Sequence, residues 1–484
     1  MTETGIFQRP AEQPTRSFTF YLLAGFLLLV FFLGGASRAD VQSLVILRPV
    51  SVMMCAFAVL TLTRADWSPQ PGLATGIIAI WLLTIAHILP LPTSIWQQLP
   101  NRAEMVEINA IAGLDAVWRP VTLAPTGGWD AVWSLFTPLA VLLLGIQLRR
   151  NELASLLTVL IGLGVLSGLL GVLQIMGNAD GPFYFYRITN NGAAVGLFAN
   201  RNHAAVMLAL LVPMLALWVS LPHEAQILQG RRKAIAGAIA MVLVPLILVT
   251  GSRSGLLAAS LGLIAAALVY RRNRTDRSDE KAGQLVRFGS PQLWVLTSVV
   301  LVGFVAAYFS RATAIERLFE QSTAQTDRSD FWAVSVDMLI NYFPFGSGSG
   351  SFPEAYQHSV PDNLLDLHFL NAAHNDWLET AVTLSLPGIV IIAVAIFGYV
   401  LRSFSIWRHH SSRHRSTAFA RMSGLAIAII CIASFFDYPL RTPIMMSVFA
   451  ILMLWFVKLP DEQSAVVTKP TSKMQRTQSK LRKA

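Results

Sequence analysis

Charged residues are scarce in this sequence. They make up 13% of its 484 residues, whereas hydrophobic residues make up 54% and the mean hydropathy is +0.55. An average soluble domain contains about 25% charged residues, so the composition excludes an ordinary soluble protein. Apolar windows of about 20 residues, the length at which a helix crosses a hydrocarbon core, recur along the chain. We therefore predict an all-α integral membrane protein.

Cysteine and the common catalytic motifs are also missing. Cys55 and Cys431 are the only cysteines, and both lie inside apolar stretches, which excludes a disulfide framework and a CxxC metal site. The sequence has no DxD-type carboxylate pair, no Walker loop and no GxSxG motif. His368 and His374 lie six residues apart, in a pattern too loose for a metal site. We therefore predict neither a metal nor a cofactor.

About twelve membrane-spanning helices fit the apolar stretches. The polar residues 1–17 form a cytoplasmic tail, and no clear cleavage site follows the first apolar stretch, so we predict a retained span. Only Gly251–Gly255 separates the spans 234–251 and 254–270, and one helix over both would be too long to cross once. The predicted spans are 18–35, 47–63, 73–91, 131–148, 153–176, 203–221, 234–251, 254–270, 292–309, 378–401, 420–437 and 443–458.

The basic residues indicate how these spans are oriented. If the N-terminus is cytoplasmic, most of the 37 lysines and arginines, including every lysine, lie on the cytoplasmic side, as expected for a membrane protein. Residues 459–484 then form a basic cytoplasmic tail, which their polar composition predicts to be disordered. This distribution accounts for the pI of about 9.9. It indicates contact with membrane lipids rather than nucleic acid.

The longest polar interruption, residues 310–377, then faces the periplasm between the spans of residues 18–309 and those of 378–458. Thr326–Asp330 has the composition of a helix start, and the glycine-rich Phe345–Gly350 is expected to end that helix because glycine accepts positive φ. On another outer loop, Asn202 is expected to cap the span 203–221 and to leave Arg201 just before its first turn.

Each of four arginines on the predicted periplasmic side could bind an anion or have a structural role. Arg253 lies between two spans, where a guanidinium either anchors the helix at the membrane surface or binds phosphate oxygens with its fork of donors. Arg328 has acidic neighbours and could form a surface ion pair instead. Arg201 could be a structural loop residue, and Arg441, beside Asp437, favours a structural role.

His374 is the candidate proton acceptor. A neutral imidazole can take a proton from a hydroxyl near pH 7, and a nearby carboxylate can orient it. Asp376 and Glu379 follow His374 closely, so we expect one of these two carboxylates to orient its imidazole. The alternative is that His374 is a polar loop residue with no role in catalysis.

Several short pieces of the chain together resemble a known family. They agree in order, spacing and predicted outer placement, although each is weak alone. The pieces are Ile88-Leu-Pro90-Leu-Pro92 with Trp96, Gly196-Leu-Phe-Ala-Asn200-Arg201-Asn202-His203, Thr250-Gly-Ser-Arg253-Ser-Gly255, Arg328 with Trp332 and Phe345-Gly-Ser-Gly348, and His374-Asn375 with Gly388.

With these pieces the chain resembles the O-antigen ligase and O-antigen polymerase superfamily of bacterial inner-membrane proteins. The resemblance implies a metal-independent, inverting glycosyltransferase that moves a glycan from undecaprenyl diphosphate to an acceptor hydroxyl on the periplasmic face. The acceptor is a lipid A-core sugar in a ligase and another polysaccharide chain in a polymerase. By resemblance, Arg253 and Arg328 would grip the diphosphate and His374 would act as the base. Secondary substrate-binding residues would be Arg201, Asn200, Asn202, Asn375 and Arg441.

Other functions remain open from the sequence. A polymerase of the same superfamily differs from a ligase mainly in its acceptor. A flippase for a lipid-linked glycan should carry charged residues at the membrane midplane, whereas the predicted spans are nearly free of charge. A non-enzymatic assembly partner would make the arginines and His374 incidental.

Overall fold

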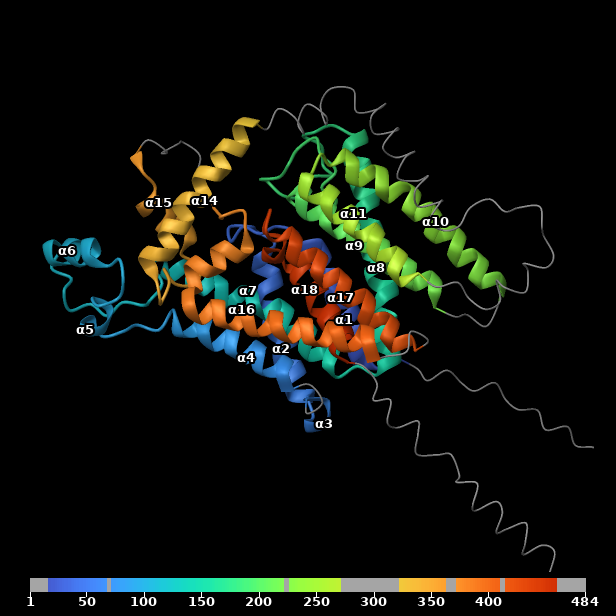
Figure 1. Ribbon diagram of the computed structural model, residues 1–484, viewed down its shortest axis with the longest axis horizontal. Coiled ribbons are helices and arrows are strands. Elements are labelled where there is room, and N and C mark those ends of the chain that lie inside the picture. Colours follow the sequence, from blue (N-terminus) through green and yellow to red (C-terminus); the bar gives the residue numbers. More distant parts are fainter. Residues whose placement is uncertain are drawn as a thin grey trace, which may run out of the picture.

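The computed structural model describes residues 16–67, 71–221, 226–270, 322–362, 371–409 and 414–458. Within these ranges every regular element is a helix, and the β pairing is limited to one isolated bridge between Leu91 and Arg119. The all-helical prediction is confirmed for this part of the chain. In chain order (Figure 1) the elements are α1 (Phe18–Leu33), α2 (Leu44–Thr61), α3 (Arg64–Trp67), α4 (Pro71–Ala86), α5 (Thr93–Trp96), α6 (Ala103–Ile111), α7 (Pro125–Ile146), α8 (Arg150–Met176), α9 (Arg201–Ser220), α10 (Gln226–Val249), α11 (Arg253–Val269), α14 (Ser322–Tyr342), α15 (Phe352–Ser359), α16 (Asp376–His409), α17 (Arg415–Ala433), the 3-10 turn η4 (Pro439–Arg441) and α18 (Pro443–Val457).

Seven helices in the described ranges are long and apolar enough to cross a membrane, namely α2, α7, α8, α9, α10, α16 and α17. The shorter apolar helices α1, α4, α11 and α18 stand where further spans were predicted. The predicted spans 234–251 and 254–270 are two helices, α10 and α11, because the chain turns at Gly251 with φ +62°. The predicted span 292–309 lies outside the described residues, so the count of twelve stays a prediction.

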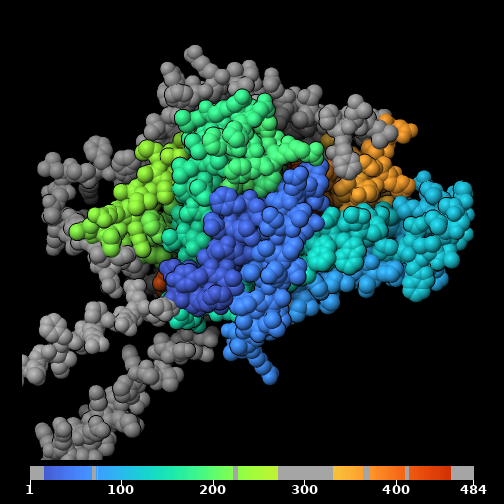
Figure 2. Space-filling view, turned by 180° about the vertical axis from the view of Figure 1, so that it is seen from behind, coloured from blue at the N-terminus to red at the C-terminus, as the bar shows by residue number. Residues whose placement is uncertain are grey.

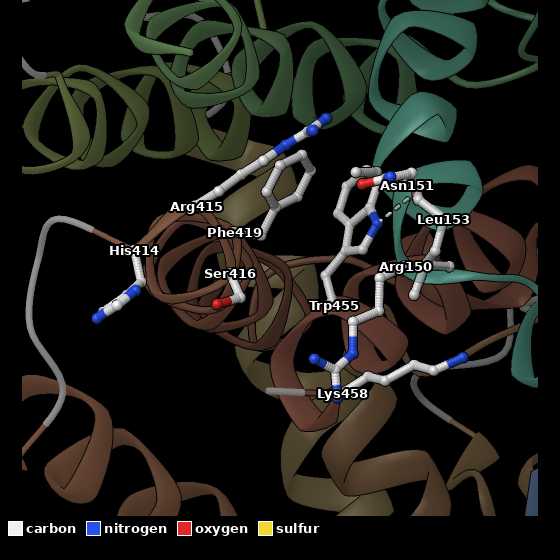
Figure 3. Close-up of a pocket in the computed structure, with 10 residues that line it drawn as sticks. Arg150, Asn151, Leu153, His414, Arg415, Ser416, Phe419, Trp455 and Lys458 are labelled. Carbon is white, nitrogen blue, oxygen red and sulfur yellow. Dashed lines mark hydrogen bonds between the residues drawn. The ribbon is translucent and has the colours of Figure 1, made fainter. Parts of the chain in front are cut away.

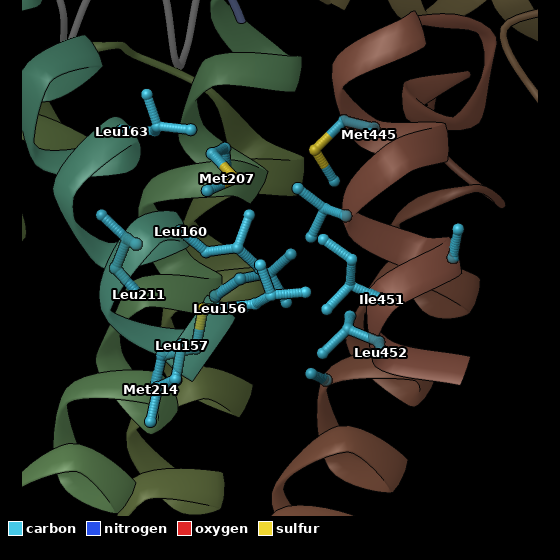
Figure 4. Close-up of a cluster of buried hydrophobic side chains, with 14 of the residues drawn as sticks. Leu156, Leu157, Leu160, Leu163, Met207, Leu211, Met214, Met445, Ile451 and Leu452 are labelled. Carbon is cyan, nitrogen blue, oxygen red and sulfur yellow. The ribbon is translucent and has the colours of Figure 1, made fainter. Parts of the chain in front are cut away.

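Helix α9 is at the centre of the bundle. Of its apolar window 83% is buried, the largest share among the seven candidate spans. Figure 4 shows its side chains meeting those of α8 and α18 in one apolar cluster. Leu160 of α8, Met207 of α9 and Met445 of α18 are each fully buried there. A helix that is apolar on every side can be stable only when other helices or lipid surround it.

Small residues bring α9 and α11 close together. A Cβ atom on Gly255 would lie 2.4 Å from the Cβ of Ala205, and one on Gly262 would lie 2.7 Å from the carbonyl oxygen of Ala209. Glycines permit this approach, as they do at many helix contacts in membranes. The order of the contacts shows that both helices run in the same direction, so their N-terminal ends lie side by side.

Helix α16 is at the outside of the bundle, since only 11% of its apolar window is buried. It is interrupted at Ser385, where φ is +42°, shortly before Pro387. Proline has no N–H to continue the helix hydrogen bonds. The carbonyl oxygens of Val382 and Thr383 instead accept from the N–H groups of Ser347 (3.1 Å) and Gly348 (3.0 Å). The interruption of α16 at Ser385 therefore leaves carbonyl groups that bind the segment after α14.

The glycine-rich segment 346–350 also contacts the region before α7. Helix α14 ends at Tyr342, which confirms the predicted break. Gly348 has φ +98°, and a Cβ there would lie 2.1 Å from the Cα of Thr122, so the backbones touch where only glycine fits. The N–H of Ser349 donates to Nδ1 of the buried His87 at 3.2 Å. In Figure 2 the region around residues 90–120, in cyan, projects from one side of the molecule.

Candidate functional site

Several loops meet at one end of the helix bundle. The Gly35 N–H donates to the Tyr186 hydroxyl at 2.7 Å, and the Gly35 carbonyl accepts from the Ala199 N–H at 3.1 Å. The Gly34 carbonyl accepts from the N–H of Ile444 in α18 at 3.1 Å. These bonds join the loop after α1, the segment before α9 and the start of α18. The sequence predicted that all three segments face the same side.

The carboxylate of Asp437 lies in the middle of this end, in the turn between α17 and α18, and is 2% exposed. Its Oδ2 accepts from Asn202 Nδ2 at 2.5 Å. Its Oδ1 lies 3.6 Å from His374 Nδ1 and 3.8 Å from His203 Nε2. These two separations are longer than hydrogen bonds, as polar contacts in unliganded active sites often are. One buried carboxylate thus connects α9 with the loop before α16.

Tyr438 packs against His203 and His374, the two histidines that face Asp437. Its ring makes edge contacts with His374, at 4.9 Å between ring centroids, and with His203, at 5.1 Å. His203 is 1% exposed, whereas the His374 side chain is 30% exposed. Only His374 can therefore reach a substrate while Asp437 lies behind it.

The surroundings of Asp437 favour its charged form. Burial by itself would raise the pKa of this carboxyl group, but the adjacent imidazoles of His203 and His374 outweigh burial and lower the pKa of Asp437 below its usual range. Burial, and then the charge of Asp437, raise the pKa of the Tyr438 hydroxyl above its usual value. At neutral pH an ionised carboxylate and a protonated phenol therefore border His374.

The backbone presents His374 at the surface of this end. Its φ is +50°, a conformation in which histidine is found more often than most residues. The next residue, Asn375, is 6% exposed and accepts at Oδ1 from the N–H groups of Trp377 (3.0 Å) and Leu378 (3.1 Å). Asn375 thus caps the start of α16. This structural role fixes the turn that carries His374.

The carboxylates expected to orient His374 are engaged elsewhere. Glu379 accepts from Arg441 Nη2 at 2.5 Å and from the Ala373 N–H at 3.0 Å. Asp376 lies 3.7 Å from Arg441 Nε and accepts from the Ser434 hydroxyl at 2.9 Å. The expectation that Asp376 or Glu379 orients His374 is therefore wrong, since Asp437 is its carboxylate neighbour.

Arg441 belongs to a different part of the same end. Its guanidinium is paired with Glu379 and Asp376 rather than with the neighbouring Asp437, and its side chain is 36% exposed. The pairing joins η4 to the first turn of α16. This favours the structural role that the sequence indicated, and the binding role of Arg441 stays a prediction.

Asn200, not Asn202, caps α9. The Asn200 side chain accepts from the Asn202 N–H at 2.8 Å, and the helix begins at Arg201. The expectation that Asn202 caps this helix is wrong because the helix begins two residues earlier than predicted. The side chain of Asn202 is thereby left to donate to Asp437. The Arg201 N–H donates to Asn190 Oδ1 at 2.9 Å.

Arg201 and Arg253 stand at the adjacent starts of α9 and α11. Ser252 caps α11 by accepting from the Gly255 N–H at 2.9 Å, and the exposed Arg253 is the first residue of the helix. Arg201 Nη1 lies 3.8 Å from the position of a Cβ on Gly251, so it reaches the turn before Arg253. The start of a helix favours anions through its N–H groups and dipole. Two such starts with two guanidinium groups can hold a phosphorylated ligand.

Arg328 lies on α14, which begins at Ser322 rather than near Thr326. A helix was predicted here and is confirmed. The side chain of Arg328 lies outside the described residues, so its contact with a substrate stays a prediction.

Two residues of this cluster were not singled out from the sequence. Asp437 was noted only as a neighbour of Arg441, and His203 only as part of a motif. The available signal for Asp437 was a carboxylate in a short outer turn between two apolar spans, where an unpaired charge is costly. No sequence signal could pair it with His374, because 62 intervening residues separate the two along the chain.

One comparison with known proteins found a similarity over part of the chain. The family model described as O-antigen ligase matches residues 236–393, about a third of the chain. The matched segment contains Arg253, Arg328 and His374, and it leaves out Arg201 and Asp437. No curated protein matches the chain. The apolar helices and the matched segment together indicate a multi-pass membrane protein.

Proposed function

We propose that this chain, which is similar to the O-antigen ligase family over residues 236–393, transfers a glycan from undecaprenyl diphosphate to an acceptor hydroxyl. The supporting observation is that His374 lies beside the buried carboxylate of Asp437, at the end of the bundle where Arg201 and Arg253 stand. The acceptor in this proposal is a sugar of the lipid A-core, as in a ligase.

In this reaction the acceptor oxygen attacks the anomeric carbon of the donor glycan. A new C–O bond forms while the bond from that carbon to the diphosphate oxygen breaks, and attack from the opposite face inverts the configuration. His374 takes the acceptor proton. Its Nδ1 faces Asp437 at 3.6 Å, which leaves Nε2 for the hydroxyl. The carboxylate stabilises the imidazolium that forms, the role that a buried aspartate has beside other catalytic histidines.

The leaving group is undecaprenyl diphosphate, whose negative charge must be neutralised as it departs. Arg253 and Arg328 are proposed to bind its oxygens, because guanidinium groups offer paired donors that match phosphate. Arg201 is close enough to the start of α11 to assist. Fixed positive charge aimed at developing negative charge is usually the largest single contribution to such a rate.

The proposed location follows from the same orientation. The protein lies in the bacterial inner membrane with both termini cytoplasmic, and residues 310–377 belong to the periplasmic side. The undecaprenyl tail then lies in lipid, while the diphosphate and glycan stand at the outer ends of α9, α11 and α16. The basic residues on the opposite side support this orientation.

The substitution Asp437→Asn tests whether this carboxylate positions His374. We expect kcat to fall by roughly 10- to 100-fold, a part of the ~10²–10⁴-fold that a positioned general base contributes. The KM for the donor should not change, because the amide has nearly the same shape and can still accept from Asn202. Steady-state kinetics on the purified variant would separate the two constants.

Asp40→Asn is the matched control, because Asp40 is a half-exposed carboxylate in the loop after α1 and pairs with Arg38 at 2.9 Å. It should leave kcat unchanged. An Asp437→Asn variant with normal kcat and a raised KM would contradict the positioning role. A fall in the melting temperature matched by equal losses in all constants would indicate structural damage instead.

The test of the function itself is transfer by the purified protein in nanodiscs containing EDTA. Undecaprenyl-diphosphate glycan is the donor, supplied with lipid A-core or with additional donor alone. Product on the core is expected, at a rate that EDTA does not reduce, because arginines take the place of a metal ion in neutralising the diphosphate.

The other outcomes are equally specific. Lengthened lipid-linked chains without core product would identify a polymerase. If neither product forms and labelled donor crosses the bilayer of proteoliposomes, the protein is a transporter and His374 has no chemical role. Loss of transfer in EDTA that is restored by a divalent cation would contradict the metal-independent mechanism.

A further inference from the structure

A second candidate site lies at the other end of the bundle. A pocket of about 210 Å³ opens between the start of α8, the start of α17 and the end of α18 (Figure 3). The start of α18 contacts Gly34 at the end where His374 lies. The 15 residues of α18 separate the two ends by about 22 Å at 1.5 Å per residue. The pocket is therefore independent of the proposed transfer reaction.

The inner wall of the pocket is apolar and fixed. Phe419 and Trp455 line it and contact each other edge to face at 5.3 Å between ring centroids. The indole N–H of Trp455 donates to the carbonyl of Leu153 at 2.9 Å, which secures the ring against α8. Trp455 is 3% exposed and Phe419 4% exposed. An indole with its N–H satisfied and its face toward a pocket is suited to the boundary between lipid and water.

The outer wall of the pocket is cationic. Arg150, Arg415 and Lys458 line it, and none of its described lining residues is acidic. Figure 3 shows Arg150 and Lys458 near one another, whereas Arg415 and His414 extend in other directions from α17. Arg150 and Arg415 are exposed. The nearby Glu152 is directed away, because it accepts from the Ser17 N–H at 2.6 Å and from Arg149 at 2.9 Å.

Lys458 fixes one cation of this group in place. Its Nζ donates to the carbonyl oxygens of Ile146 (3.0 Å) and Leu148 (2.8 Å) at the end of α7. Burial lowers the pKa of the Lys458 ammonium group, while the charge of Asp66, which does not line the pocket, acts in the opposite direction. Three cations thus border one pocket without an anion among its lining residues, an arrangement that an anionic ligand would stabilise.

The position of the pocket determines which anion it would meet. It lies at the side that carries the basic residues and is proposed to be cytoplasmic, where anionic lipid headgroups are concentrated. A phospholipid headgroup brings a phosphate and a glycerol backbone together, which match the cationic and the aromatic wall. We propose that this pocket binds the headgroup of an anionic phospholipid, with its phosphate at the wall that carries Arg150, Arg415 and Lys458 and its glycerol against Trp455.

The experiment measures lipid binding to the purified full-length protein in detergent by native mass spectrometry. The probes are phosphatidylglycerol, phosphatidylcholine and inorganic phosphate, each added separately. We expect bound phosphatidylglycerol in preference to phosphatidylcholine. The double variant Arg150→Gln with Arg415→Gln should bind phosphatidylglycerol roughly 30-fold more weakly, since each basic residue near an anionic lipid contributes on the order of a fivefold gain in affinity.

The matched control is Arg64→Gln with Arg231→Gln, which removes the same charge at exposed arginines that do not line the pocket. It should bind phosphatidylglycerol as the unchanged protein does. Equal weakening in both double variants, or equal binding of phosphatidylcholine, would overturn the proposal. Inorganic phosphate that binds with the same dependence on Arg150 and Arg415, and displaces the lipid, would show a free-phosphate site instead.

A second measurement does not depend on the variants. A ligand that binds only the folded protein raises its melting temperature. Phosphatidylglycerol should therefore raise the melting temperature of the unchanged protein more than phosphatidylcholine does. No difference between the two lipids would contradict the proposal even if the double variant failed to fold.

Discussion

Replacing His374 by alanine is expected to reduce glycan transfer by about 10²–10⁴-fold, the contribution of a positioned general base. The acceptor proton then has no acceptor beside the reacting oxygen, although Asp437 and both helix starts remain in place. The protein should still insert and accumulate, because the His374 side chain is 30% exposed and contributes little to the packed core. Initial rates with saturating donor and acceptor would measure the loss.

His374→Asn is the more stringent form of this test. Asparagine tolerates the positive φ of +50° found at this position, whereas alanine adds strain. Asparagine cannot accept the proton, so its activity should fall as far as that of the alanine variant. Transfer at the normal rate by either variant would remove His374 from the reaction.

His358→Ala is the matched control for the histidine. This side chain is 29% exposed and lies 3.3 Å from Glu104, so it resembles His374 in exposure and in having a carboxylate neighbour. It should transfer glycan at the normal rate. An equal loss in both variants would show that any histidine change at this face disturbs the protein.

Replacing Arg253 by alanine is expected to reduce transfer by about 10²–10³-fold, as the removal of one charge-stabilising donor does in other enzymes. The loss should appear mainly in kcat, because the negative charge on the diphosphate grows as the glycosidic bond breaks. Arg253→Lys should restore little activity, since an ammonium group offers a point charge in place of the paired donors of a guanidinium.

Arg187→Lys and Arg187→Ala are the controls for Arg253. Arg187 lies in the segment before α9, its side chain is 86% exposed, and it pairs with Asp40 at 3.7 Å. Both changes should leave transfer unchanged. If Arg253→Lys retained full activity, the guanidinium would not be needed, and Arg253 would be an anchor of α11 at the membrane surface.

The helices themselves were predictable because membrane spans have a strong local signal. A run of about 20 apolar residues is sufficient to identify a span, and the turn at Gly251 was enough to divide α10 from α11. The break after Tyr342 followed from three glycines in five residues. These features depend on neighbours in the sequence, so no tertiary information was needed.

The caps and ion pairs were less predictable because they depend on where each helix begins and what faces it. Asn202 has the composition of a cap, but the start of α9 at Arg201 gives that role to Asn200 and directs Asn202 to Asp437. Glu379 follows His374 closely in the chain, yet the turn of α16 directs it to Arg441. Proximity in sequence therefore misidentified the carboxylate beside His374.

Composition and short motifs were enough to predict an all-helical membrane protein, its resemblance to one family, and His374, Arg201 and Arg253 as candidate residues. The packing of the helices, by contrast, brings Asp437 to His374, Arg201 to the start of α11, and Arg150, Arg415 and Lys458 to one pocket. The reason is physical. Which helix ends meet depends on the packing of α9, α11, α17 and α18 against one another, and this packing is specified by side-chain shapes along whole helices rather than by any local pattern.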